Sequence, residues 1–184
     1  AYDEGRDAGG MVVIGSTASV EGTLHGDAFA GEYQLRNGVI GTAKSGIALD
    51  TRALQATAQQ RPSGGFLRLG SFSGSSGVGL GGDILVHADG ASDLPTGQGV
   101  FLLSDRQLSK AGLSALTLQT SGGVTFGAGS QLTLADGGKL TVDAGRTINF
   151  DGTVTARSGA VSARTYELAG TIYRSALAAT GSVF

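Results

Sequence analysis

Short apolar–polar–apolar triplets recur along residues 116–150 at a constant eight-residue spacing. The triplets are LTL, VTF, LTL, LTV and INF, and they begin at Leu116, Val124, Leu132, Leu140 and Ile148. Alternation over three residues points two side chains to one face and the central one to the other, as in a half-buried strand. Glycines between the triplets exclude a helix across this stretch. The pattern therefore predicts short strands, one for each triplet, joined by Gly-rich corners.

Strands this short favour a coiled solenoid over a meander of hairpins, whose strands usually have about five or six residues. In a coil with three faces, each triplet stacks on the third triplet after it. That turn places Leu116 on Leu140 and Phe126 on Phe150. In a coil with two faces, each triplet stacks on the second one after it, which places the LTL at Leu116 on the LTL at Leu132. The spacing alone does not choose between them, but stacking Phe on Phe favours three faces.

The flanking sequence continues the strand pattern with less regular spacing. Segments 11–26, 66–72, 83–90 and 99–105 are interpreted as strands between Gly-rich corners, and VTA at 154 and VSA at 161 follow after shortened corners. Residues 52–65 and 90–98 hold the two prolines and are interpreted as loop excursions from the coil. The run 47–63 begins like a strand, and its Ala-rich remainder could form a short helix. No interior linker divides the chain, so residues 1–184 are predicted to form one module.

The composition fits an ordered, weakly charged all-β domain. The 184 residues include 33 Gly and 2 Pro, and the combined share of these two residues lies below the level of about 25–30% that suggests disorder. Hydrophobic residues make up 40% of the chain, whereas charged residues make up only 15%, against about 25% in an average domain. The surface is therefore expected to consist largely of Thr, Ser, Asn, Gln and Gly.

The charge balance limits the partners that the sequence suggests. The net charge is −2, and no basic excess indicates nucleic acid or anionic lipid as a partner. Residues 1–30 hold five acidic side chains against Arg6 alone, which is interpreted as a solvated end. No apolar run reaches the length of about 18 residues that a membrane span needs. The absence of Cys excludes disulfides and thiolate metal sites.

Several strings resemble the large secreted exoproteins of the filamentous-haemagglutinin type in Gram-negative bacteria, the passengers of two-partner secretion. The strings are SVEGTLHGDA, GGDILVHADG, LSALTLQTSGGVTF and GGKLTVDAGRTINFDGTVTARSG, and the resemblance is best over residues 80–170. It implies a right-handed parallel β-helix, a secreted or cell-surface location, a shaft-like role in adhesion and virulence, and a host-cell or bacterial-surface receptor or glycan as partner.

One departure from that family concerns its secretion domain, which carries an Asn-Pro motif. This sequence contains no Asn-Pro. The chain therefore resembles an interior or distal segment, and the outer-membrane transporter is expected to engage the parent protein elsewhere. The opening AYDEGRDAGG is not a signal peptide, so an export signal is expected outside these residues, and the polypeptide is expected to continue beyond at least one end.

The densest titratable cluster lies in GGDILVHADG, where Asp83 and Asp89 bracket His87. Glycosidase chemistry needs two carboxylates about 5 to 9.5 Å apart, so these two residues are the carboxylates to examine first. In a strand, however, His87 lies on the opposite face from Val86 and is expected to be solvated, as is His25. The remaining prominent carboxylates stand beside Gly and are interpreted as turn formers: Asp136, Asp143 and Asp151.

Cofactor and metal motifs are absent from the sequence. ADGG and HADG echo calcium-binding nonapeptides, but no tandem array follows. His25 and His87 are far apart in the sequence, and without Cys they do not predict a zinc site. GVGLGGD at 77–83 precedes a strand, whereas a dinucleotide fingerprint follows one, and SGSSG at 73–77 is interpreted as a loop. No catalytic, cofactor-binding or metal-binding residue is predicted.

Outward Thr residues raise the question of an ice-binding array, because Thr117, Thr125, Thr133 and Thr141 occupy the triplet centres. On a three-faced coil only Thr117 and Thr141 share a face, so ordinary surface Thr of high β-propensity is the preferred interpretation. The predicted function is a non-enzymatic structural and adhesive segment of a surface exoprotein. The alternative is a carbohydrate-binding or carbohydrate-active β-helix, although Trp is absent and only 6% of residues are aromatic, which leaves few platforms for stacking on sugars.

Overall fold

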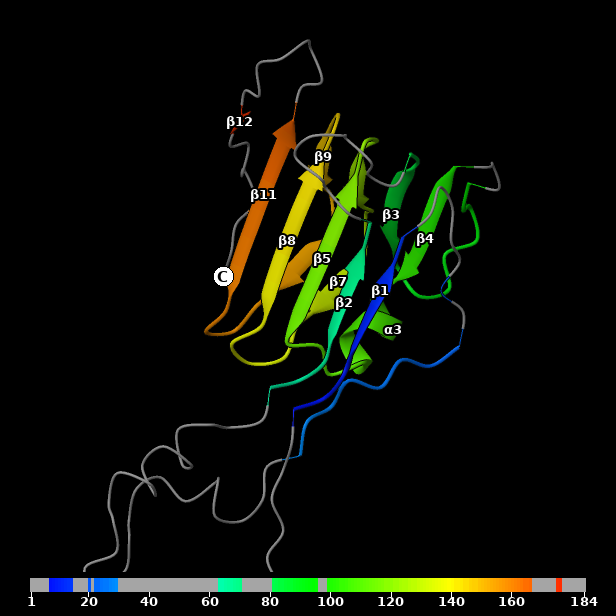
Figure 1. Cartoon of the computed structure of the whole chain (residues 1–184). Coiled ribbons are helices and arrows are strands. Elements are labelled where there is room, and N and C mark those ends of the chain that lie inside the picture. The colour runs from blue at the N-terminus through cyan, green and yellow to red at the C-terminus, as the bar shows by residue number, and fades with distance from the viewer. Residues whose placement is uncertain are drawn as a thin grey trace, which may run out of the picture.

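The structure is a computed structural model that describes residues 7–14, 20, 22–29, 63–70, 81–95 and 99–166, together with the backbone of residues 175–176. Within these residues the chain is mostly strand, arranged in parallel sheets, with very little helix (Figure 1). An all-β class is thereby confirmed at the level of secondary structure and strand direction.

The largest sheet, sheet A, crosses the molecule from β1 at one edge to β12 at the other (Figure 1). In spatial order its strands are β1 (Gly10–Val13), β2 (Phe66–Leu69), β5 (Ala115–Thr120), β8 (Lys139–Ala144), β11 (Ala160–Tyr166) and β12 (Ser175–Ala176). Every neighbouring pair is parallel except β11 and β12, which are antiparallel.

Two smaller parallel sheets complete the architecture. Sheet B has the order β4 (Val100–Ser104), β3 (Asp83–His87), β6 (Val124–Phe126) and β9 (Ile148–Phe150). Sheet C pairs β7 (Gln131–Thr133) with β10 (Thr153–Thr155). From β5 onward the chain visits sheets A, B and C in turn and then repeats the same order from β8 to β10 before entering β11.

Strand register confirms the repeat of three triplets between 116 and 150. Leu116 pairs with Leu140 and Phe126 pairs with Phe150, so each triplet meets the third one after it. The outward pairs also form as predicted, since Thr117 lies opposite Thr141. Stacking of the triplet at Leu116 on the one at Leu132, which the two-faced alternative requires, is wrong because the two strands belong to different sheets.

The next turn is shorter, as the irregular spacing after residue 150 indicated. Leu140 pairs with Val161 and Leu132 pairs with Val154. Both partners come earlier in the sequence than an unchanged repeat would place them. Because the strands stay in register while the corners shorten, the same side-chain columns continue into β11.

The core lies between the three sheets and is built from the inward residues of the triplets. Its largest fully buried side chains are Phe101, Phe126, Leu67, Leu69, Ile84, Leu103, Leu108, Leu116, Leu118, Leu132 and Leu140. The rings of Phe126 and Phe150 stack with centroids 4.7 Å apart and planes inclined by 6°. Each fully buried Leu or Phe contributes about 1.5–3 kcal/mol relative to leaving it exposed, so this column of apolar residues is the main source of stability.

A short helix, α3 (Asp105–Lys110), follows β4 and packs against β7. The sequence interpretation did not expect it. Ser104 is its N-cap, with a side-chain oxygen that accepts a hydrogen bond from the Gln107 amide at 3.3 Å. The Ser109 hydroxyl accepts a hydrogen bond from the Thr133 amide at 2.9 Å and donates one to the Gln131 carbonyl at 3.3 Å. The helix thus covers the edge of β7 that faces away from β10.

The other segment predictions have mixed outcomes. Strands form within 66–72, 83–90 and 99–105. Of the described residues in the predicted segment 11–26, only 11–13 belong to a strand, which begins at Gly10. Residues 90–95 run outside any strand, as the predicted excursion requires. Residues 63–65 of the other predicted excursion also run outside any strand. Residues 47–62 and 96–98 and the motifs at 73–77 and 77–80 lie outside the described residues.

Candidate functional site

The predicted cluster in β3 is spread over the length of the strand. Asp83 opens β3 and His87 ends it, so their Cα atoms are about 13 Å apart at about 3.3 Å per residue. The Asp83 carboxylate accepts a hydrogen bond from the Gly123 amide at 2.7 Å and so holds the corner that leads into β6. Asp83 and Asp89 therefore lie at opposite ends of the strand and do not form a glycosidase-like pair.

The other two members of the cluster have separate partners. His87 is half-buried, not fully solvated as expected, and its Nδ1 lies 2.9 Å from the Ala88 carbonyl oxygen. Asp89 forms an exposed ion pair with Arg106, with 2.7 Å between Oδ2 and Nη1. The Arg106 and Asp89 side chains are 61% and 49% exposed, so their charges are accessible to a polar ligand, and the pair contributes at most about 1 kcal/mol to stability.

Asp105 is a buried carboxylate that the sequence interpretation missed. Its side chain is 6% exposed and accepts hydrogen bonds from three backbone amides. These amides belong to Asp89 at 3.0 Å, Arg106 at 2.5 Å and Gln131 at 2.6 Å. The three contacts tie the β3–β4 loop, helix α3 and strand β7 to one another. Asp105 is thus a structural acceptor whose oxygens are already engaged.

A shallow polar hollow of about 450 Å³ opens above this carboxylate. Its lining combines the Asp89–Arg106 ion pair with polar side chains from α3 and β7, namely Ser109, Lys110, Gln131 and Thr133. No aromatic side chain is among the residues that line it. The hollow presents charged and hydroxyl groups to solvent, a chemistry that suits hydrogen bonds to a polyhydroxylated ligand and provides no stacking surface.

A row of hydrogen-bonded side chains crosses the outer face of sheet A. Arg68 donates to the Gln119 side-chain oxygen from Nη2 at 2.9 Å and from Nε at 3.2 Å. Gln119 then donates to Asp143 at 2.9 Å, and the Tyr166 hydroxyl donates to the other Asp143 oxygen at 3.3 Å. The row joins β2, β5, β8 and β11. It corrects the prediction that Asp143 is a turn former, because Asp143 lies inside β8 and is only 7% exposed.

The remaining candidates occupy the positions that the sequence predicted. Asp136 lies in the turn before Gly137, whose φ of 76° suits glycine, and Asp151 lies in the corner after β9. His25 is exposed. Within the described ranges, no three His, Asp or Glu side chains are grouped so that they could hold a metal ion.

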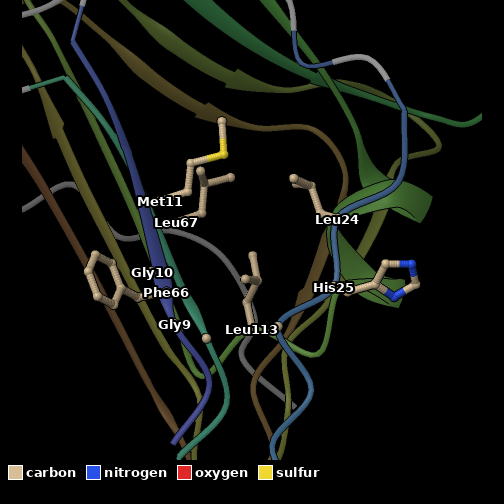
Figure 2. Close-up of a pocket in the computed structure, with 10 residues that line it drawn as sticks. Gly9, Gly10, Met11, Leu24, His25, Phe66, Leu67 and Leu113 are labelled. Atoms are coloured by element: carbon tan, nitrogen blue, oxygen red, sulfur yellow. The ribbon is translucent and has the colours of Figure 1, made fainter.

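An apolar hollow of about 250 Å³ lies where β1 meets the segment at residues 24–26. Figure 2 shows Met11 and Leu67 on the strand side and Leu24 and Leu113 across from them. His25 lies at its rim and points away from these side chains in the same view. The hollow is the end of the apolar interior beside β1, since Leu67 and Leu113 belong to the core.

Comparisons with known proteins add no family to these observations, because no family model, curated protein or solved structure matches the chain. Among the described residues, no helix has the length and apolar character needed to cross a membrane.

Proposed function

We propose that this chain is a structural and adhesive segment of a secreted bacterial surface exoprotein, and that its fold is a right-handed parallel β-helix with three faces. In this proposal the chain forms part of a shaft that presents outward surfaces and loops for attachment to a host-cell or bacterial receptor or glycan. The resemblance to filamentous-haemagglutinin-type exoproteins led to the same expectation.

The observation that carries the proposal is the repeated passage through three sheets. Strands β5, β6 and β7 are followed by β8, β9 and β10, and each strand pairs in parallel with its equivalent in the preceding set. Parallel neighbours lie about 4.8 Å apart, so every such set would lengthen a rod by that amount. A stack in which each turn contacts only its neighbours suits an extended spacer better than a closed catalytic domain.

The hydrogen bonding of the carboxylates also supports a structural role. Asp83, Asp105 and Asp143 each accept hydrogen bonds that join separate strands or corners. A carboxylate that serves as a general acid or base needs an oxygen free to exchange a proton with a substrate. Asp105 and Asp143 use both carboxylate oxygens, and Asp83 uses one, to hold successive segments of the fold.

A carbohydrate-binding module is the second candidate, and the polar hollow above Asp105 favours it. The exposed ion pair of Asp89 and Arg106 offers an acceptor and a donor to sugar hydroxyls. Arg106→Ala should then weaken glycan binding, whereas Asp93→Asn, an exposed change outside the lining of the hollow, should leave it unaltered.

The test is binding and turnover measured on the same preparation. The purified chain is titrated onto host cells and onto an array of bacterial and host glycans, and the polysaccharides are then assayed for new reducing ends. Saturable binding without cleavage supports the adhesive role. Cleavage that is lost in Asp83→Asn or Asp89→Asn would overturn it, as would the absence of binding to every surface tested. A far-ultraviolet circular dichroism spectrum dominated by helix would contradict the proposed fold.

A further inference from the structure

Among the described strands, β1 is an apolar strand at the edge of sheet A. It is the first strand in the spatial order of that sheet, and its side chains include Met11 at 43% and Val12 at 51% exposed. Ile14, directly after the strand, is 64% exposed. Exposed apolar edge strands are surfaces for adding a further strand. The hollow beside Met11 extends this surface into the interior of the fold (Figure 2).

The opposite side of sheet A offers a matching edge on β11 (Figure 1). Strand β12 pairs there with Thr165 and Tyr166 only. The first four residues of β11, from Ala160 to Ala163, lie outside that pairing within the described part of the chain. Since β1 also has four residues, this stretch of β11 equals the length of β1.

The register of the sheet shows how the two edges would meet. Pairing runs from Met11 through Leu67, Leu116 and Leu140 to Val161, one residue on each strand. A second inward column runs from Val13 through Leu69, Leu118 and Val142 to Ala163. If β1 of one copy continued the sheet beyond β11 of another, Met11 would lie on Val161 and Val13 on Ala163. Both apolar columns would continue without interruption.

The charges at the two ends are complementary. The described residues between 7 and 29 contain Asp7 and Asp27 and no Lys or Arg. The described residues from 139 to 166 contain four basic side chains against Asp143 and Asp151, and Asp143 is buried by its own hydrogen bonds. The four basic residues are all exposed: Lys139, Arg146, Arg157 and Arg164. Opposite charge of this kind favours head-to-tail over head-to-head contact.

We propose that the chain binds a second copy of itself head to tail, with β1 of one copy adding in parallel to residues 160–163 of β11 in the other. The contact is heterologous, so it leaves an open β1 at one end and an open β11 at the other and can extend into a filament. The end of a stack of short strands is a small surface, and small interfaces bind weakly. The association is therefore expected to depend on protein concentration. The inference rests on the register and the charges and is independent of the adhesive role. It concerns the chain as a separate molecule, because flanking turns of a longer covalent shaft would occupy the same two edges.

Disulfide trapping tests the contact directly, because the chain has no Cys. In the proposed register Val12 lies opposite Ser162, and Cα atoms of parallel neighbours are about 4.8 Å apart, within the range of about 4.4–6.8 Å that a disulfide spans. Val12→Cys and Ser162→Cys variants, one of them carrying a larger tag, are mixed and oxidised. The mixed disulfide should form in several-fold excess over that of a control pair, Val12→Cys with Asn149→Cys, whose second cysteine lies in sheet B. Equal yields from the two pairs, or a predominant Val12→Cys homodimer, would overturn the proposal.

Sedimentation of the Cys-free chain gives an independent test. Association should rise with protein concentration and weaken as salt is raised, since the exposed charges are screened. Met11→Lys places a charge in the apolar seam and should abolish association, whereas Gln131→Lys adds the same charge on β7, away from the seam, and should preserve it. A chain that stays monomeric at all concentrations, or a Met11→Lys variant that associates like the parent, would contradict the inference. Circular dichroism establishes that each variant is folded.

Discussion

Replacing Phe126 by Ala is the sharpest test of how side-chain packing in the interior stabilises the fold. Phe126 is fully buried in β6, between β3 and β9, and its ring stacks on Phe150. Truncation of a buried Phe to Ala costs about 3–5 kcal/mol, because apolar contacts are lost and a cavity remains. Since a domain of ordinary stability has about 5–15 kcal/mol in total, this one change removes a large part of it.

Phe150→Ala should cost less than Phe126→Ala. Phe150 is only partly buried and packs against the core from its periphery. A partly exposed ring loses less transfer free energy on truncation, so about 2 kcal/mol is expected for this variant. The double variant isolates the interaction free energy between the two rings. For an aromatic pair this coupling free energy is expected to be about 0.5–1.5 kcal/mol.

The assay is urea unfolding followed by far-ultraviolet circular dichroism, with the midpoint and the slope fitted for each variant. Thr125→Ala is the matched control, because Thr125 lies between the same two strands but points outward and is half-buried. It should shift the midpoint only slightly. If Phe126→Ala unfolds at the same midpoint as Thr125→Ala, or if the two Phe variants are strictly additive, the stacked-ring account of the interior is wrong.

Four further changes test individual contacts by the same unfolding assay. Asp105→Ala should destabilise by at least about 2 kcal/mol, because three backbone amides lose their acceptor; an unchanged midpoint would mean that these amides find other partners. Gly159→Ala should cost about 1–3 kcal/mol, because its Cβ would collide with the Gly138 carbonyl oxygen, and a neutral result would show that the corner can move. Ser158→Gly should stabilise by up to about 1 kcal/mol, because Ser158 has a φ of 52°, and a loss of stability would refute strain there. Ser130→Ala should be neutral or stabilising, because the Ser130 hydroxyl is buried without a hydrogen-bond partner in the described structure; a large loss would reveal a missed partner.

The repeat could be read from the sequence because each buried position depends on a local alternation. Leu116, Leu140 and Phe126 recur at the eight-residue spacing, and their pairing follows once three faces are assumed. The choice of three faces depended on a single comparison, Phe126 against Phe150. The pairing of these two residues is confirmed, and their rings stack because one flat ring covers another well.

Helix α3 was missed although the sequence carries a signal for it. Ser104 and Gln107 have the spacing of a capping box, S-x-x-Q, which marks the start of a helix. The preceding run VFLLS is strongly strand-like, and a helix of six residues has too few turns to show an apolar period. Local alternation therefore identified β4 and concealed the change of structure at Asp105.

Asp143 was misassigned because Asp beside Ala and Gly is usually found in turns. Strands β5 and β8 both run past their triplets to six residues, so the alternation continues outward to Gln119 and Asp143. Both side chains are then brought opposite each other by the pairing of the two strands. The predicted stacking of Leu116 on Leu140 implies this pairing only if both strands extend past their triplets, which the turn-like Asp-Ala-Gly sequence concealed.

Two carboxylates, one selected from the sequence (Asp83) and one missed (Asp105), perform a common task in this fold. In parallel sheets of short strands, corner and edge amides lie beyond the regular ladders and need other acceptors. Asp83 binds the amide of Gly123, and Asp105 binds that of Gln131, each across a long separation in sequence. Short acidic side chains at strand ends are well suited to this task, because they reach an amide without entering the apolar interior. A search for function on this chain should therefore begin at groups that no corner uses: the exposed Asp89–Arg106 pair and the apolar edge of β1.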